Sequence, residues 1–258
     1  MGTQRVGWPH SLSPMSTSDP DTALPRFRLD PDQTHPPLLS PDYVSTRLRA
    51  PLKSPVDLPQ RITEVTGPVL GEDLVYEDDA DLTLGFASAP AGQRILVSGR
   101  LLDGDGRPIP RSLVEIWQAN AAGRYRHDRD SWPAPLDPNF DGMGRTLTDD
   151  EGRYTFTTVK PGAYPWRNHH NAWRPAHIHF SVFGRSFTQR LVTQMYFPAD
   201  PLFAQDPIFN SVPEAARDRL IARFSLEETK PDWALAFSFD IVLRGSDATP
   251  LEAEQPLP

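Results

Sequence analysis

Short runs of strand-like sequence, separated by turn signals, constrain the fold of this chain most. Two runs, 112–118 and 153–159, alternate apolar and polar side chains for most of their length, as half-buried strands do. Asp-Gly pairs at 103–106 and a Thr-Asp-Asp-Glu-Gly run at 148–152 supply the turns. This pattern predicts an all-β antiparallel β-sandwich with few short helices, one of them over 213–224. The expected strands cover 94–102, 112–118, 153–159, 177–183, 188–196 and 236–243.

Proline sets the first part of the chain apart from this β-rich part. Many of the 29 prolines fall within residues 1–60, where they forbid a long helix. We expect a Pro-rich N-terminal arm whose first ~20 residues are disordered and whose remainder lies extended over a surface. The predicted division is the arm (1–60), a connector with a short helix (61–92), the β-sandwich (93–246) and a C-terminal tail (247–258).

Composition excludes several classes of function. The 258 residues carry a formal net charge of −8, so the bulk basic character of a nucleic-acid-binding protein is missing. The chain has no cysteine, which excludes disulfides, thiolate metal sites and cysteine nucleophiles. No apolar run approaches the ~20 residues that span a membrane, and the N-terminus lacks a signal-peptide core. We therefore expect a soluble cytoplasmic protein without a nucleic-acid or membrane partner.

Two histidines and two tyrosines provide the candidate chemistry. His177 and His179 are two residues apart in a strand-like run, so both rings can face one point. Tyr164 and Tyr125 lie upstream in turn-rich sequence. A phenol is a good ligand only when a strong Lewis acid removes its proton, and Fe³⁺ fits that requirement. Two tyrosinates and one hydroxide also cancel the charge of Fe³⁺, which allows the centre to be buried.

Other metals and other histidines fit less well. Zn²⁺ would favour His, Cys or carboxylate ligands, and a ferrous 2-His-1-carboxylate site would need an acidic residue close after the His-x-His pair. Gly184, Arg185 and Ser186 stand there instead. His127, His169 and His170 are further candidates, which we expect at the surface or behind the ligands.

Several motifs in the same order resemble the intradiol ring-cleaving dioxygenases, over roughly residues 35–246. A resemblance that spans separate motifs in the right order is specific. It implies a prealbumin-like sandwich core that holds non-haem Fe(3+). The motifs are Val114–Asn120, Gly123–His127, Pro135–Phe140, Lys160–Trp166, Trp173–Phe180 and Phe239–Gly245.

The resemblance assigns roles residue by residue. Its four iron ligands correspond to Tyr125, Tyr164, His177 and His179, with Tyr164 as the axial tyrosinate that leaves the metal when substrate binds. The remaining site positions are a cation near the reacting ring, a glutamine beside the oxygen pocket, two side chains packed around the ring, and a tyrosine that receives a substrate carboxylate. Arg174 corresponds to the cation near the ring, and Gln194 to the glutamine beside the oxygen pocket. Trp166 and Ile208 correspond to the side chains packed around the ring, and Tyr43 to the tyrosine that receives the carboxylate.

The implied reaction is O₂-dependent cleavage of a catechol between its two hydroxylated carbons. For protocatechuate, the substrate that the resemblance favours, the product is 3-carboxy-cis,cis-muconate. Catechol or hydroxyquinol as substrate, and a non-catalytic prealbumin-like module, stay open as alternatives. The implied partner is a homologous α subunit in a larger hetero-oligomer, with the site at the α–β interface. Trp132 and the pair His169-His170 depart from the family's usual residues and leave substrate preference open.

Overall fold

The computed structural model describes residues 34–37, 39–40, 75–167, 170–183 and 190–252. Tyr43, His169, the first ~20 residues and most of the N-terminal arm lie outside the described residues. The strands are β1 (Arg94–Leu102), β2 (Leu113–Trp117), β3 (Met143–Leu147), β4 (Arg153–Val159), β5 (Tyr164–Trp166), β6 (Ala172–Arg174), β7 (His177–Phe183), β8 (Arg190–Tyr196), β9 (Arg223–Lys230), β10 (Ala234–Ser238) and β11 (Ile241–Val242). The helices are η2 (Glu77–Ala80), η3 (Pro201–Gln205), α3 (Pro207–Ser211), α4 (Glu214–Arg217) and η4 (Asp218–Leu220), where η marks a 3₁₀ helix.

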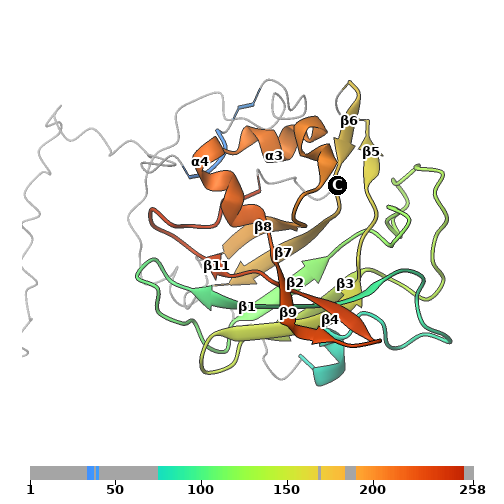
Figure 1. Cartoon of the computed structure of the whole chain (residues 1–258), viewed down its shortest axis with the longest axis horizontal. Coiled ribbons are helices and arrows are strands. Elements are labelled where there is room, and N and C mark those ends of the chain that lie inside the picture. Colours follow the sequence, from blue (N-terminus) through green and yellow to red (C-terminus); the bar gives the residue numbers. More distant parts are fainter. Residues whose placement is uncertain (1–33, 38, 41–74, 168–169, 184–189, 253–258) are drawn as a thin grey trace, which may run out of the picture.

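Two sheets form the predicted β-sandwich (Figure 1). One sheet has the strand order β3-β2-β7-β8 and is antiparallel throughout. In the other, of order β11-β1-β10-β9, strand β4 also pairs with β1. The fold is thus the expected all-β sandwich, with a departure in detail: β1 runs parallel to both β10 and β11.

The main hydrophobic core lies between the two sheets. Its buried side chains come from both sheets, which is how a sandwich removes apolar surface from water. They include Ile95 and Val97 of β1, Phe156 of β4, and Phe180 and Val182 of β7. A smaller cluster packs α3, α4 and η4 against Tyr196 at the end of β8.

Strand β7 has both faces covered. Ile178 and Phe180 point into the main core, whereas His177 and His179 occupy the alternate positions, and all four are buried. Consecutive strand residues point to opposite faces, so one strand serves the core with one face and the candidate site with the other. Strand β7 is also an interior strand, with β2 and β8 on its two edges.

The prediction of one helix over 213–224 is wrong for the second half of that range. Helix α4 ends at Arg217, a 3₁₀ turn follows to Leu220, and β9 begins at Arg223. The reason is tertiary: Ile221 forms a parallel bridge with Tyr196, and the buried Ala222 donates its backbone N–H to the Tyr196 carbonyl (2.8 Å). Pairing with β8 satisfies these backbone groups and overrides the local helix preference.

The strand expected over 236–243 is interrupted between β10 and β11. Phe239 donates its N–H to the Ser98 carbonyl (2.8 Å) and accepts a hydrogen bond from Tyr154 Oη, so its backbone is satisfied outside a regular ladder. The Asp240 carboxylate accepts from the Arg100 N–H (2.9 Å). These contacts interrupt the ladder, and β10 and β11 pair with β1 in the same register on either side of the interruption.

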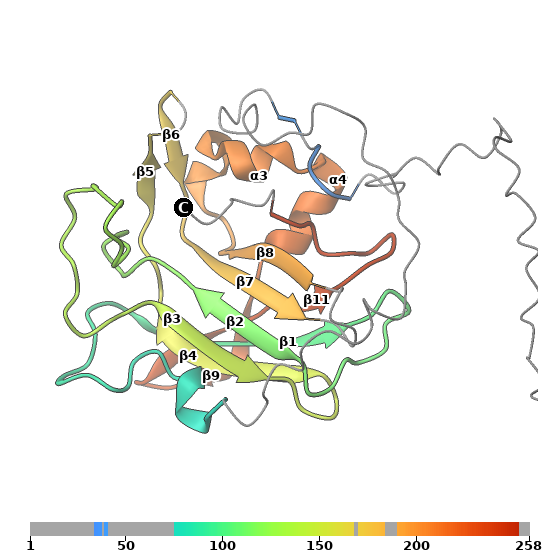
Figure 2. The same ribbon diagram turned by 180° about the vertical axis from the view of Figure 1, so that it is seen from behind.

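Two short helices that sequence reasoning did not expect lie next to the site. Each begins with an Asp-Pro pair, Asp200-Pro201 for η3 and Asp206-Pro207 for α3, in which the aspartate accepts a backbone N–H. This N-cap with proline at the first helical position is a readable start signal. Figure 2 shows these helices beside the hairpin β5–β6, which stands off the end of β7. Within the described residues no helix is long and apolar enough to cross a membrane.

Candidate metal centre

The register across β2, β7 and β8 lines up one face of the sheet. His179 stands opposite Trp117 of β2 and Gln194 of β8, and His177 stands opposite Tyr196. Directly opposed residues of antiparallel strands share a face, so all five side chains gather on the side away from the core. The Trp117 and His179 rings stack with centroids 4.8 Å apart and planes 6° apart.

The hairpin β5–β6 brings a tyrosine and an arginine to this face. Tyr164 of β5 and Arg174 of β6 are cross-strand partners. Pro175 and Ala176 then lead directly into β7, which begins at His177. The chain thus delivers Tyr164, Arg174 and His177 to one place through a single short connection.

Tyr125 comes from the loop between β2 and β3, which Asn120 holds in shape. The Asn120 side-chain oxygen accepts from the N–H groups of Ala122 (2.9 Å) and Arg124 (3.0 Å), and its side-chain nitrogen donates to the Pro135 carbonyl (3.0 Å). The Tyr125 N–H donates to the Asp130 carboxylate (2.8 Å). Such side-chain-to-backbone bonds replace secondary structure as the support of the loop.

Gly123 lets this loop approach the strand that carries Tyr164. Its φ is +77°, and a Cβ at this position would lie 2.3 Å from the Ala163 carbonyl oxygen. Only glycine combines that backbone conformation with so close an approach. Gly123 therefore sets the distance between the two tyrosine-bearing segments.

Four side-chain donors converge at the resulting site. The Tyr125 hydroxyl is 3.2 Å from His179 Nε2, and the Tyr164 hydroxyl is 3.3 Å from His177 Nε2. The two imidazole centroids are 4.9 Å apart, and the two phenol rings meet edge to face at 5.6 Å. Both histidines are buried, whereas both tyrosines retain partial exposure. Sequence reasoning predicted this set, and the structure brings all four together.

Both imidazoles are held from behind, so that Nε2 faces the phenols. His177 Nδ1 lies 2.7 Å from the Pro175 carbonyl, and His179 Nδ1 lies 3.0 Å from Glu252 Oε2. A ring whose Nδ1–H is given to an acceptor presents the lone pair of Nε2, which is the form that binds a metal. Two phenol oxygens and two such nitrogens fit a hard trivalent cation.

Protonation equilibria point to the same need for a strong Lewis acid. Desolvation raises the pKa of Tyr125 well above its usual value, and the neighbouring Tyr164 adds to this. Desolvation also raises the pKa of Tyr164, although Arg174 acts in the opposite direction. Desolvation, then Arg174 and His179, lower the pKa of His177 well below its usual value. Without a cation the phenols stay protonated and the His177 imidazole stays neutral.

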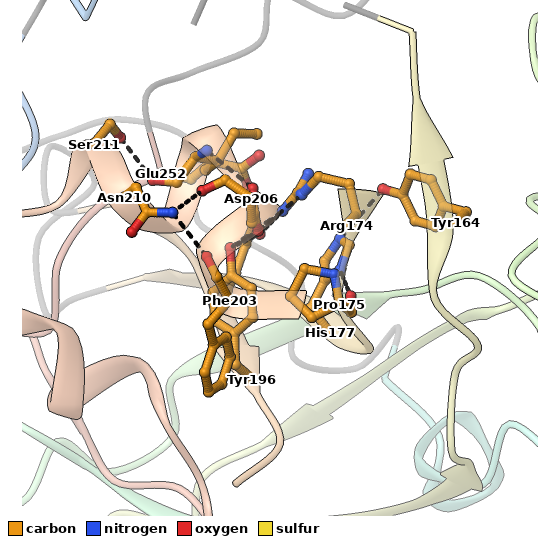
Figure 3. A network of polar contacts seen from close by, with 12 residues as sticks. Tyr164, Arg174, Pro175, His177, Tyr196, Phe203, Asp206, Asn210, Ser211 and Glu252 are labelled. Carbon is orange, nitrogen blue, oxygen red and sulfur yellow. Dashed lines mark hydrogen bonds and ion pairs between the residues drawn. The ribbon is translucent and has the colours of Figure 1, made fainter. Parts of the chain in front are cut away.

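Arg174 is the centre of a buried polar network (Figure 3). Its Nε donates to Asp206 Oδ2 (3.1 Å), and its Nη2 donates to the Gln194 side-chain oxygen and to Tyr196 Oη (3.2 Å). Arg174 and Asp206 are almost wholly excluded from solvent. A buried cation of this kind persists only when it is paired and hydrogen-bonded.

Asp206 ties this network to helix α3. Its second oxygen accepts from the Ile208 N–H (2.9 Å), which caps α3, the helix that carries the buried Ile208. Trp166, predicted beside the substrate ring, lies with its ring centroid 5.8 Å from the Arg174 guanidinium carbon. Gln194 and Ile208 both line a small cavity of about 10 Å³, which Tyr196 and Glu252 also line.

The other sequence candidates lie apart from the four donors or cannot be placed. His127 is exposed and its Nδ1 accepts from the Arg129 N–H (3.1 Å), and His170 is exposed in the turn before β6. The Trp132 ring packs edge to face on Trp173 (6.2 Å). Tyr43 and His169 lie outside the described residues, so the predicted carboxylate contact stays a prediction.

Sequence reasoning missed Glu252. This buried residue follows β11, and its carboxylate meets His179 from 73 positions away. Desolvation alone would raise its pKa, but His179, Arg174 and Gln194 lower the pKa overall. The carboxylate contacts Nδ1 rather than Nε2, and no group of three or more His, Cys, Asp or Glu converges among the described residues. The arrangement is therefore not that of a 2-His-1-carboxylate site.

Comparison with known proteins reveals two family matches along the chain. Residues 65–245 match the dioxygenase family model, and residues 27–61 match the N-terminal model of the protocatechuate 3,4-dioxygenase beta subunit. The protocatechuate 3,4-dioxygenase beta chain of Burkholderia cepacia is 58% identical over 221 residues, which cover 85% of this chain and 94% of that one. The corresponding alpha chain of Pseudomonas putida is 32% identical over 203 residues, covering 74% and 95%.

A solved structure supports the fold independently of close sequence identity. The crystal structure of 3-chlorocatechol 1,2-dioxygenase from Rhodococcus opacus 1CP matches with a TM-score of 0.50 at 23% identity. The match covers 65% of this chain and 66% of that chain. The shared part is the β-sandwich architecture.

Proposed function

The chain belongs to the intradiol dioxygenase family, and from this premise we propose that it is the iron-bearing chain of an enzyme that cleaves protocatechuate with O₂. The product would be 3-carboxy-cis,cis-muconate. The observation that carries the proposal is the convergence of the Tyr125 and Tyr164 hydroxyls with Nε2 of His179 and His177, at 3.2 and 3.3 Å. Identity of 58% to a protocatechuate 3,4-dioxygenase beta chain supports the choice of substrate.

The proposed cofactor is Fe(3+), held by Tyr125, Tyr164, His177 and His179. When bound, ferric iron supplies the Lewis acidity that removes the phenol protons and makes a chelated catechol reactive toward O₂. The remaining task of the chain is to orient the ring and to manage protons and charge. In the metal-free site both tyrosines have raised pKa values, so a strong Lewis acid such as ferric iron is needed to make them phenolate ligands. His177 is neutral, which is the form of imidazole that binds a metal.

Tyr164 is the residue that we assign to proton transfer. As the phenolate that bound iron would produce, its oxygen can accept one proton from a catechol hydroxyl and become the neutral phenol, which is a general-base role. Arg174 favours the phenolate form of Tyr164, because its charge lowers a pKa that desolvation raises. Tyr164 is also only partly buried and belongs to a two-stranded hairpin, which constrains it less than a strand of the sandwich would.

Arg174 is assigned to the stabilisation of negative charge on the reacting ring. A fixed cation is most effective when it needs no reorganisation during reaction. The hydrogen bonds to Asp206, Gln194 and Tyr196 provide that rigidity. We assign Gln194 to the oxygen pocket, Trp166 and Ile208 to packing around the ring, and Tyr43 to the substrate carboxylate.

A substrate without the carboxylate is the second candidate. A hydroxyquinol 1,2-dioxygenase of Rhizobium is 33% identical to this chain, but the match spans 47% of its length. We therefore favour protocatechuate over catechol and hydroxyquinol. A substrate panel tests this choice, and Tyr43→Phe should impair turnover of protocatechuate more than that of catechol.

We also propose a homologous α subunit as partner, in a larger hetero-oligomer. The matches to both a beta and an alpha chain support this assignment. Co-expression of the chain with the α-type chain from the same genome should yield one co-purifying complex. The cytoplasmic location predicted from the sequence is part of this proposal, and fractionation of the source cells tests it.

Colour is the direct test of the iron site. Charge transfer from tyrosinate to Fe³⁺ should make the purified protein red-brown, and anaerobic protocatechuate should shift the absorption band. Tyr164→Phe should alter the band and slow turnover, whereas His127→Gln, at an exposed histidine, should do neither. A protein that stays colourless after iron reconstitution would refute the proposal.

A further inference from the structure

Glu252 reaches the candidate metal centre from a segment to which neither the sequence nor the family resemblance assigns a role. The segment follows β11 and is fastened to β8, the neighbour of β7. The Glu252 N–H donates to the Val192 carbonyl (2.7 Å), and Thr193 Oγ1 donates to the Pro250 carbonyl (2.6 Å). Contacts at Pro250 and at Glu252 itself therefore hold this segment against β8, and Glu252 is 7% exposed.

The environment of His179 leaves its ring one orientation. Trp117 covers one face of the imidazole at 4.8 Å, Glu252 Oε2 lies 3.0 Å from Nδ1, and the Tyr125 hydroxyl lies 3.2 Å from Nε2. A carboxylate can only accept, so the 3.0 Å contact requires the proton of a neutral ring on Nδ1. The Nε2 lone pair then points to the side of the tyrosines.

The two imidazoles of the site differ in what holds them. His177 Nδ1 meets the neutral Pro175 carbonyl, whereas His179 Nδ1 meets the Glu252 carboxylate. A carboxylate behind an imidazole raises the basicity of the ligating nitrogen more than a neutral acceptor does. The donor strength of the site is therefore concentrated on His179.

The charges around the site also call for a cation. The described residues of the polar network contain two buried carboxylates, Asp206 and Glu252, and one guanidinium, Arg174. Asp206 already pairs with Arg174 at 3.1 Å. A buried carboxylate without a balancing charge is expensive, and a cation bound at Nε2 of His179 would balance Glu252 through the ring.

We propose that Glu252 is a positioning residue of the iron centre. It locks His179 in the tautomer whose Nε2 faces the metal and, as an anion, favours ferric over ferrous iron at that position. This inference rests on the proposed iron site above. It adds a residue that contacts neither substrate nor metal and acts through His179.

Glu252→Gln isolates the charge, because glutamine keeps an acceptor of the same shape for Nδ1–H. Glu252→Ala removes both charge and hydrogen bond. Glu227→Gln is the matched control, since it makes the same charge change at an exposed position of β9. Circular dichroism and thermal melting of the metal-free proteins show whether each variant folds.

Two measurements on the iron-loaded proteins report on the proposed role. Competition with a chelator should show ferric iron held roughly 10–100-fold more weakly in Glu252→Gln than in wild type. A tenfold loss selective for ferric over ferrous iron would raise the one-electron midpoint potential by about 59 mV in a spectroelectrochemical titration. Glu227→Gln should match wild type in both. Equal potentials and equal iron retention in Glu252→Gln and Glu227→Gln would overturn the proposal.

A third measurement needs no variant of Glu252. In metal-free wild-type protein labelled with ¹⁵N-histidine, with His179→Gln used for assignment, the proton should reside on Nδ1 of His179 and not on Nε2. A proton on Nε2 would overturn the proposal even if Glu252→Gln failed to fold. A wild-type protein that never binds iron refutes the proposed function instead, so the two failures are distinguishable.

Discussion

Replacing Asp206 by alanine should destabilise the protein more than any single exposed substitution. The side chain is fully buried and accepts three hydrogen bonds, from Arg174 Nε (3.1 Å), Tyr196 Oη (3.1 Å) and the Ile208 N–H (2.9 Å). Asp206→Ala thus removes the anionic partner of a buried guanidinium and the cap of α3 at once.

The magnitude follows from these contacts. Leaving a buried charge unpaired costs roughly 3–5 kcal/mol, and loss of an aspartate N-cap costs about 1 kcal/mol. Together they amount to roughly 4–6 kcal/mol. In a chain of this size that lowers the melting temperature by roughly 8–24 °C. Asp206→Asn should lose less, because its one side-chain oxygen can still accept on one side, from Arg174 or from the Ile208 N–H, whereas alanine accepts on neither.

Thermal melting of the metal-free protein, followed by circular dichroism, measures these losses. Asp150→Ala, at an exposed aspartate, is the control and should melt like wild type. The double variant Asp206→Ala/Arg174→Met should lose less than the sum of the two single variants, since no unpaired charge remains. A shift below about 2 °C for Asp206→Ala, or additive losses in the double variant, would refute the reasoning.

Two further predictions concern the core and the tyrosine loop. Burial raises the pKa of Tyr154 well above its usual value, so above about pH 10 the unfolded chain loses this proton and the folded chain keeps it. Tyr154 alone should therefore lower stability by up to about 1.4 kcal/mol per pH unit; Tyr154→Phe should reduce the slope by about this amount in urea titrations, and an unchanged slope would contradict the assignment. Gly123→Ala should weaken the visible absorption of the iron-loaded protein, because its Cβ would meet the Ala163 oxygen at 2.3 Å. Gly106→Ala, with a φ of +76° but open space around it, should cost only backbone strain; equal losses of absorption in both would rule out the close approach as the cause.

The sequence predicts those parts of the fold that local pattern controls. The expected strand 94–102 coincides with β1, and 177–183 coincides with β7, because alternation and flanking turns are local. The helix expected over 213–224 fails beyond Leu220, where pairing with Tyr196 decides the conformation. Backbone pairing with a distant strand leaves no mark in a short window of sequence.

The site divides in the same way. Spacing alone places His177 and His179 on one face of a strand. The resemblance of their motifs to the family identifies Tyr125 and Tyr164 as candidate ligands. Asp206 carries a readable signal, the Asp-Pro start of α3, but its ion pair with Arg174 depends on the packing of η3, which Asp206 follows, against β6. Glu252 carries no local signal, since only the path of the chain after β11 brings it to His179.

The four candidate metal ligands lie on elements that differ in local stability. His177 and His179 sit on an interior strand of the sandwich, so their backbone opens only when the sheet unfolds. Tyr164 sits on a two-stranded hairpin and Tyr125 on a loop, which can open at a small fraction of the global free energy. Amide hydrogen exchange should therefore be slow at the histidines and fast at the tyrosines. A metal held in this way would have its two histidine ligands fixed for the lifetime of the fold, and Tyr164 on its hairpin would be the ligand best placed to move within each turnover.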